Sequence, residues 1–142
     1  MASDPKGLGA KFDAHTNAEF NTRDMDATMA TMGDAPHVTH VPTMTGGSGY
    51  DAVRHFCENY FVGRVPADWS VKLISRTVGE SQLVDGVLIS FTDDFDMPAI
   101  LPGVKPTGRK VVIRSSWWSA STRTRSSSAS IGTRRACWPS SA

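Results

Sequence analysis

Titratable side chains gather in two short stretches of the sequence, and both stretches border apolar segments. His37 and His40 lie three residues apart, and Asp93, Asp94 and Asp96 follow closely on an apolar run. Histidine titrates near neutral pH, so His40 could orient a ligand or move a proton. The alternative is a structural role, in which His40 bonds to the Gly-rich segment that follows it.

Metal and phosphate sites find little support in these stretches. A strand places only residues i and i+2 on one face, so His37 and His40 would not face the same metal ion. The Gly-rich segment 46–49 lacks the lysine and the preceding buried strand of a phosphate-binding loop, which favours a turn that leads into a helix. The sequence therefore predicts neither a metal site nor a cofactor.

The acidic residues have two interpretations. A carboxylate that removes a proton next to a carbonyl group must be partly desolvated in an apolar cavity, whereas three acids so close together are also typical of a solvated loop. Asp85 differs, because it interrupts the apolar face of a predicted strand, residues 83–92, and so could point into a pocket. Trp69, Phe91 and Met97 could line that pocket.

The stretch from residue 48 to residue 61 predicts the strongest helix, around which we expect the other elements to pack. Its apolar residues recur at i, i+3, i+4, i+7 and i+8, which gives one continuous buried face. Ser48 could cap its start, and Gly63 could end it. The residues of this face are Val53, Phe56, Cys57, Tyr60 and Phe61.

The remaining periodicities predict an α+β domain with helices against one face of a curved antiparallel sheet. A first helix reaches about Phe20, and a second begins at Asp24 or Asp26 with three methionines on one face. A short strand over residues 37–41 is followed by a meander. The strands of this meander are expected at Trp69–Val78, Leu83–Thr92 and Arg109–Ile113.

Composition limits the classes of function that this chain could have. With 142 residues and a formal net charge of +1, the chain fits one domain and gives no reason to expect a nucleic-acid or membrane partner. No apolar leader and no membrane-length apolar run occur, so we expect a cytoplasmic protein. Two cysteines, Cys57 and Cys137, make a disulfide framework improbable.

The last 29 residues, 114–142, differ from the rest of the chain. They contain ten Ser and five Arg but no acidic residue, whereas residues 1–113 hold 10 basic against 14 acidic side chains. Neither a strand nor a helix period is evident, which predicts an irregular tail. Three Trp residues are nevertheless unusual in a disordered segment.

A resemblance to a known protein family rests on four stretches of the sequence. They are FNTRDMDATMATM, HVTHVPTMTGGSGYDAVRHF, WSVKLISRTVGE and LPGVKPTGRKVVI. Residues 8–113 resemble the SnoaL-like polyketide cyclase branch of the nuclear transport factor 2-like superfamily. The resemblance implies a cone-like sheet around a pocket for a small hydrophobic carbonyl compound, with His40 near its mouth.

In such proteins an acidic group performs acid–base chemistry, which points to Asp94, Asp96 or Asp85. Close relatives carry His where this chain has Asp93, which puts a catalytic role of that loop in doubt. Some relatives are linked with dienelactone (carboxymethylenebutenolide) hydrolases, so lactone hydrolysis is a variant, although the nucleophile motif Gly-x-Ser-x-Gly is absent. The alternative is a non-catalytic ligand-binding or homodimerising module.

The resemblance also suggests an origin for the tail. Codons that are permitted for residues 114–142 can be translated in a reading frame shifted by one base. That frame can encode a run of valines and then Tyr-Trp-Asp-Gln-Ala-Ser-Val-Leu, which resembles the family's sequence at this point. We therefore predict a truncated SnoaL-like domain over residues 1–113 and a frameshifted tail over residues 114–142. The last strands of the sheet would then be missing, which would leave an open edge after Ile113 and a marginally stable, aggregation-prone chain.

Overall fold

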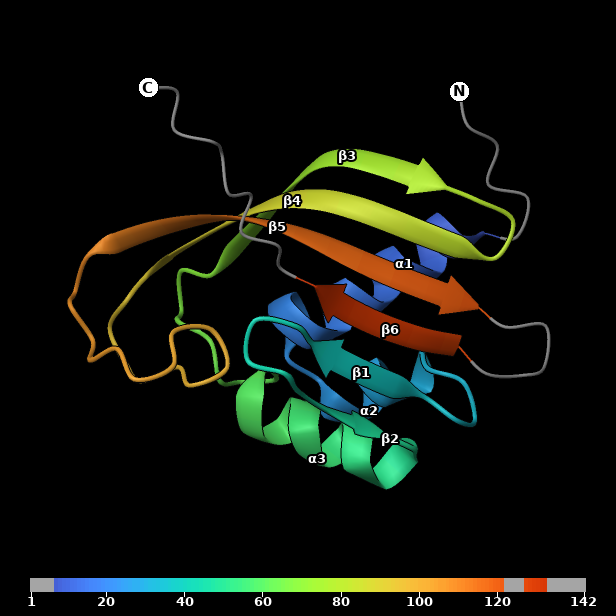
Figure 1. Ribbon diagram of the computed structural model, residues 1–142, viewed down its shortest axis with the longest axis horizontal. Coiled ribbons are helices and arrows are strands. Elements are labelled where there is room, and N and C mark those ends of the chain that lie inside the picture. The colour runs from blue at the N-terminus through green and yellow to red at the C-terminus, as the bar shows by residue number, and fades with distance from the viewer. Residues whose placement is uncertain (1–6, 122–126, 133–142) are drawn as a thin grey trace, which may run out of the picture.

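The computed structural model describes residues 7–121 and 127–132 of the chain. Three N-terminal helical segments are followed by a six-stranded sheet in the order β2-β1-β6-β5-β4-β3 (Figure 1), which confirms the predicted α+β class. All strand pairs are antiparallel except β1 and β6. The elements are α1 (Leu8–Thr16), a π-helical segment η1 (Asn17–Thr22), α2 (Met25–Ala30), β1 (His37–His40), β2 (Thr45–Ser48), α3 (Tyr50–Tyr60), β3 (Ser70–Val78), β4 (Gln82–Thr92), β5 (Lys110–Ser121) and β6 (Ser127–Gly132).

The first predicted helix continues beyond its expected end and changes type. After Thr16 the chain takes a π-helical turn and leaves it at Arg23, whose backbone is left-handed (φ 54°). Phe12 and Phe20 of this helical segment are buried, and both rings contact Trp117 of β5. Asp24 then caps α2 by accepting a hydrogen bond from the Ala27 amide at 2.9 Å, as one of the two predicted starts requires.

Helix α3 packs its apolar face inward as predicted, and Val53, Phe56 and Cys57 are buried. Its start differs from the prediction, because the helix begins at Tyr50 after Gly49, and no side chain accepts a capping hydrogen bond there. The Gly-rich segment is not a turn either, since residues 45–48 pair with β1 as strand β2. Gly46 permits this pairing, because a Cβ at that position would overlap the Val38 carbonyl group.

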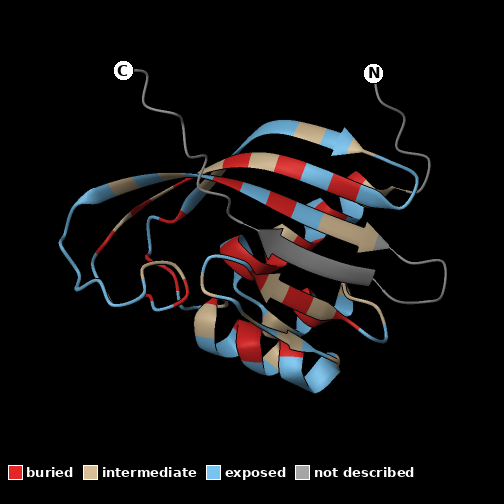
Figure 2. Cartoon of the chain, in the orientation of Figure 1, coloured by how far each residue is buried: buried red, intermediate tan, exposed pale blue. Residues whose placement is uncertain are grey.

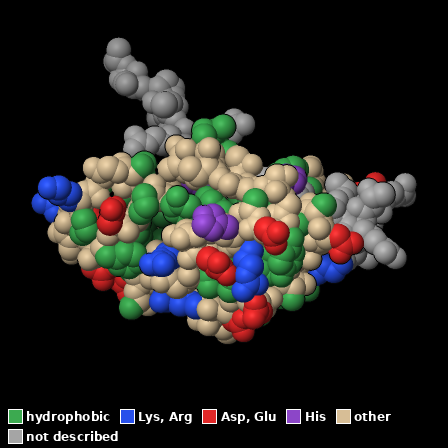
Figure 3. Space-filling view, turned by 90° about the horizontal axis from the view of Figure 1, so that it is seen from below, with side chains coloured by type: hydrophobic (Ala, Val, Ile, Leu, Met, Phe, Trp, Pro, Cys, Tyr) green, Lys and Arg blue, Asp and Glu red, His purple; other side chains and the backbone are tan. Residues whose placement is uncertain are grey.

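The solvent side of α3 carries paired charges. Arg54 contacts Asp26 of α2 and Glu58 of the same helix, each at 2.8 Å. Figure 3 shows acidic and basic side chains side by side on this face of the molecule. Only the Arg54–Asp26 pair joins α2 to α3, and both pairs are partly solvated, so each contributes little to stability.

Strand β4 shows the predicted alternation. Its inward residues are all buried, and they alternate with half-buried or exposed residues (Figure 2). Because successive side chains point to opposite faces, this pattern places one face against the helices. The inward residues are Leu83, Asp85, Val87, Ile89 and Phe91.

The strand predicted to end at Ile113 continues to Ser121, so that expectation is wrong. Ser115 and Trp117 are buried while Ser116 and Trp118 are exposed, which is the alternation of a sheet strand rather than of an irregular tail. Strand β5 pairs with β4 on one side and with β6 on the other, so no open edge follows residue 113. The frameshift stays a prediction, and Cys137 lies outside the described residues.

Within the described ranges, no helix combines the length and apolar character needed to cross a membrane.

Candidate functional site

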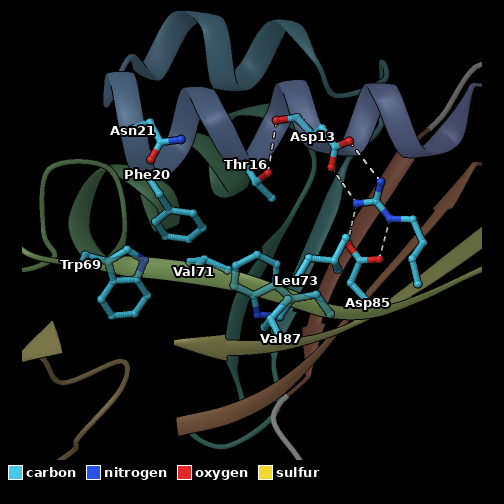
Figure 4. A pocket seen from close by; sticks show the side chains of 11 residues that line it. Asp13, Thr16, Phe20, Asn21, Trp69, Val71, Leu73, Asp85 and Val87 are labelled. Carbon is cyan, nitrogen blue, oxygen red and sulfur yellow. Dashed lines mark hydrogen bonds and ion pairs between the residues drawn. The ribbon is translucent and has the colours of Figure 1, made fainter. Parts of the chain in front are cut away.

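A cavity of about 180 Å³ lies between the first helix and the sheet. Figure 4 shows Asp13, Thr16, Phe20 and Asn21 reaching into it from the helical side, opposite side chains of strands β3 and β4. The strands and the segment before them contribute Trp69, Val71, Leu73, Arg76, Asp85, Val87 and Trp117. Apolar walls with a few polar groups are typical of small-molecule sites.

Aromatic rings form one end of this cavity. Phe20 stacks on both Trp69 and Trp117, with ring centroids 5.6 Å apart and planes inclined by 25° in each pair. Trp69 stacks in turn on Phe91 at 5.1 Å. Each ring is therefore fixed by a neighbour, and the wall is formed before any ligand arrives.

An ion-pair network forms the other end. The Arg76 guanidinium donates to both carboxylate oxygens of buried Asp85, at 2.8 and 2.7 Å, and to both oxygens of Asp13, at 2.7 and 3.1 Å. Hydrogen bonding to Asp85 is the largest cause of a raised Arg76 pKa. Four of the five N–H groups of Arg76 are thus used within the described chain, and one on Nη1 remains for a ligand.

Two buried hydrogen-bond donors in the cavity wall lack partners. The indole Nε1 atoms of Trp69 and Trp117 contact no acceptor in the described residues, although both side chains are buried. In Figure 4 the ring nitrogen of Trp69 lies on the edge turned toward Val71 and the cavity. An unsatisfied buried donor costs about 1–3 kcal/mol, so such groups require an explanation. A ligand that carries an acceptor atom would satisfy them.

His40, the predicted catalytic histidine, is buried at 2% exposure and does not line this cavity. Its Nδ1 lies 2.8 Å from the Thr43 hydroxyl, which lies 2.7 Å from that of Thr45. Burial lowers the pKa of His40, so the imidazole is neutral near pH 7. His37 borders a separate, open groove over β1 and β2.

The acidic loop after β4 has a structural centre. Buried Asp93 accepts hydrogen bonds from the amide and hydroxyl of Thr107, at 2.9 and 2.8 Å, and thereby closes the loop before β5. Asp94 and Asp96 are exposed and lie outside the cavity lining, so the structure gives their predicted catalytic roles no support. Met97 is buried in the core without reaching the cavity.

Comparison with solved structures decides the fold. A protein from Burkholderia pseudomallei described as nuclear transport factor 2-like and of unknown function superposes with a TM-score of 0.65 at 14% identity, over 89% of each chain. A candidate SnoaL-like polyketide cyclase from Jannaschia sp. gives 0.63 at 11% identity, over 92% of this chain and 90% of the other. This chain has the nuclear transport factor 2-like fold.

A third structure with this fold was solved with a small molecule bound. It is a hypothetical protein from Catenulispora acidiphila with a ketosteroid isomerase-like fold, in complex with trimethylamine. Its TM-score is 0.63 at 8% identity, over 95% of this chain and 88% of the other. No protein-family model and no curated protein matches the sequence significantly. The comparisons thus establish the nuclear transport factor 2-like fold and not an activity.

Sequence reasoning named Trp69 and Asp85, which both line this cavity, but missed most of the other lining residues. Arg76 and Asp13 were missed because their pairing joins residues 63 positions apart. Trp117 was missed because it lies in the segment that was taken for an irregular tail. Across β4 and β5 of this nuclear transport factor 2-like sheet, Trp117 pairs in register with Asp85.

Two buried ionisable residues of the first helix were also missed. Glu19 is 1% exposed, and its Oε2 lies 3.7 Å from Nε2 of His15, one helical turn earlier. Burial raises the pKa of Glu19 to about 8 and lowers that of His15 to about 4. The spacing of His15 and Glu19, i and i+4 on one helix, was the signal in the sequence that could have predicted their pairing. Among the residues that the structure describes, no three His, Cys, Asp or Glu side chains converge as metal ligands would.

Proposed function

We propose that this chain is a small-molecule-binding domain whose cavity holds a compact hydrophobic carbonyl compound, a ketone or a lactone. The observation that carries the proposal is the pair of unpartnered indole donors, Trp69 Nε1 and Trp117 Nε1, in the wall of a cavity that Phe20 also lines. Such donors require an acceptor such as a carbonyl oxygen, while the rings around them favour an apolar body.

The size of the cavity limits the ligand. At about 180 Å³ it is smaller than a typical drug-sized site of roughly 300–1,000 Å³. It is close to the engineered cavity of about 150 Å³ that accommodates benzene. A single-ring compound therefore fits, and an oxygen on it could accept a hydrogen bond from one of the two indole donors.

The electrostatics of the site favour polarisation of that oxygen. An indole N–H donor fixed by a stacked ring would stabilise partial negative charge on a carbonyl oxygen. Asp85 accepts two hydrogen bonds from the Arg76 guanidinium, so it fixes Arg76 rather than accepting a proton from a ligand. The function that we propose is accordingly the binding of a carbonyl compound.

The test compares two rings that differ only in the carbonyl group, δ-valerolactone and tetrahydropyran, by isothermal titration calorimetry. Because a net hydrogen bond contributes about 1 kcal/mol, we expect the lactone to bind several-fold more tightly. The variant Trp69→Phe keeps an aromatic ring but removes the donor, and should reduce this preference while tetrahydropyran binds as before. Equal affinity for the two rings in the unmodified protein would refute the proposal.

A homodimer is a second candidate property, and the outward face of the sheet favours it. Val84 and Trp118 are register partners on β4 and β5 and are 38% and 36% exposed, and Val112 is 64% exposed. A second copy of the chain would cover these apolar side chains, although Arg114 and Ser116 separate Val112 from Trp118 on the same face. Light scattering should then give twice the chain mass, and Val84→Lys should give the monomer mass. A monomer in the unmodified protein would exclude the dimer.

A further inference from the structure

A polar cluster outside the cavity lies directly beside Trp69. The Asp68 carboxylate accepts hydrogen bonds from the Thr92 amide at 2.9 Å, from the Thr92 hydroxyl at 2.8 Å and from the Lys110 ammonium group at 2.8 Å. The lining of the cavity includes none of these three residues. Asp68 nevertheless precedes Trp69 in the chain, and the indole nitrogen of Trp69 is one of the two unpartnered donors in the cavity wall.

The register of the sheet shows what the Asp68 carboxylate replaces. Strand β3 begins one residue after Trp69 and pairs with β4 in antiparallel register. Continued past the start of β3, this register sets Trp69 opposite Phe91, and the two rings stack with centroids 5.1 Å apart. The next pair is Asp68 and Thr92. Because the backbone ladder has ended there, the side chain of Asp68 accepts the hydrogen bond of the Thr92 amide in place of a backbone carbonyl group.

Lys110 completes the cluster from the other side of β4. It is the register partner of Thr92 on β5, so its ion pair with Asp68 crosses β4. Hydrogen bonding to Lys110 is the largest cause of a lowered Asp68 pKa, and the carboxylate therefore stays charged at neutral pH. The segment before β3 is thus attached to the ends of two strands.

A second set of hydrogen bonds attaches the same segment to the helical side of the cavity. The Trp69 amide donates to the Pro66 carbonyl group at 3.1 Å, which closes a turn. The same carbonyl oxygen accepts a hydrogen bond from the Arg23 guanidinium at 3.1 Å. Arg23 directly follows the π-helical segment η1, which carries Phe20, and the Phe20 ring stacks on Trp69. Trp69 is therefore held between the helical segment and the sheet.

We propose that Asp68 is the positioning residue of the Trp69 donor, because it fixes the backbone from which the indole N–H reaches the cavity. The inference rests on the proposed binding of a carbonyl compound. Stacking on Phe20 and Phe91 restrains the plane of the indole ring but not its direction within that plane, since flat ring faces can slide over each other. Direction matters, because a hydrogen bond weakens steeply once its angle falls below about 120°.

The first test observes the indole groups in the ligand-free protein by ¹H–¹⁵N NMR with labelled tryptophan. Asp68→Ala removes all three hydrogen bonds of the cluster, so the Trp69 indole signal should shift or split while that of Trp117 moves much less. Asp94→Ala removes an exposed carboxylate two residues after Thr92 and is the matched control, which should leave both signals in place. An unchanged Trp69 signal in Asp68→Ala, or equal movement of both signals, would overturn the positioning role.

The second test measures the affinities of δ-valerolactone and tetrahydropyran by isothermal titration calorimetry. Asp68→Ala should lose the several-fold preference for the lactone while tetrahydropyran binds as before. Lys110→Met removes only the ion pair and should lose part of this preference. In the Trp69→Phe background, Asp68→Ala should cause no further loss, because both changes act on the same hydrogen bond.

The outcomes separate this inference from the proposed function. An intact lactone preference in Asp68→Ala, or losses that add in the double variant, would overturn the positioning role alone. Equal affinity for the two rings in the unmodified protein would refute the proposed function. The NMR comparison of the ligand-free proteins would then still decide whether Asp68 fixes the Trp69 indole.

Discussion

At the scale of single residues, buried polar groups distinguish this molecule from an ordinary apolar core. Asp85 is neutralised by Arg76, whereas the indole donors of Trp69 and Trp117 lack hydrogen-bond partners in the described chain. The first arrangement is complete without a ligand, and the second is not. This contrast is the reason to assign Arg76 and Asp85 to the scaffold of the site and the two indole donors to the binding of a ligand.

Because Arg76 is the counter-ion of buried Asp85, its replacement should have a large effect on stability. Arg76→Met leaves Asp85 buried at 2% exposure without its counter-ion, which should lower the free energy of unfolding by about 3 kcal/mol. Asp13→Asn changes only the solvent-exposed partner and should cost less than about 1 kcal/mol. Urea denaturation followed by circular dichroism measures both. Equal losses in the two variants would show that Asp85 is not the partner that matters.

Glu19 and His15 together predict how stability depends on pH. Between about pH 4.5 and 8 the folded chain keeps a proton on Glu19 that the unfolded chain releases, so stability falls as the pH rises. His15 acts in the opposite direction between about pH 4 and 6.5 and offsets this loss there. Above pH 6.5 only the Glu19 contribution remains.

We therefore expect the melting temperature to decline from pH 6.5 to 8, by an amount equivalent to roughly 2 kcal/mol. Glu19→Gln carries no ionisable group at this position and should abolish the decline. Differential scanning calorimetry across this range provides the measurement. A flat profile for the unmodified protein would mean that Glu19 is already ionised in the folded state.

At the scale of elements, the sequence was informative where periodicity alone determines structure. The apolar stripe of α3 and the alternation of β4 predicted both elements, and Asp85 lies on the buried face of β4. The hairpin of β1 and β2 was misread, because glycines that signal a turn also permit a close approach of two strands. The site partners Arg76 and Asp13 required tertiary contacts that no local pattern encodes.

The close approach at β2 gives a direct prediction. In Gly46→Ala the new methyl group would meet the Val38 carbonyl group, so the hairpin must shift and the domain should lose about 1–3 kcal/mol of stability. Gly79→Ala places its methyl group 3.5 Å from the nearest atom and serves as the control. If chemical denaturation gives the two variants equal stability, the hairpin does not have the described register.

At the scale of the whole molecule, residues beyond Ile113 are part of the sheet. Strand β5 crosses that position, and β6 lies between β5 and β1, so these two strands connect the two halves of the sheet. The Ser- and Arg-rich composition concealed this role, because the residue types of Ser-Ser-Trp-Trp (115–118) do not alternate, although burial alternates over residues 111–118. A frameshift in the coding DNA and participation in the sheet are compatible.

Removal of residues 114–142 should therefore abolish cooperative folding. It deletes β6 and more than half of β5, and it exposes the inner edge of β4 and the apolar face beneath it. We expect the truncated chain to aggregate or to melt without a sharp transition, whereas the full chain melts cooperatively. A soluble truncated chain with an unchanged melting temperature would contradict the described sheet.

The proposed carbonyl-binding site depends most directly on the unpartnered indole donors. In a ¹H–¹⁵N spectrum of the protein with labelled tryptophan, added δ-valerolactone should shift the indole signals of Trp69 and Trp117 downfield. The indole of Trp118 donates to Gln82 at 3.2 Å on the outward face and should not move. Selective movement of the Trp69 and Trp117 signals would place the carbonyl oxygen in the cavity. If they stay in place at saturating lactone, or if Trp118 responds equally, the cavity is not a carbonyl-binding site.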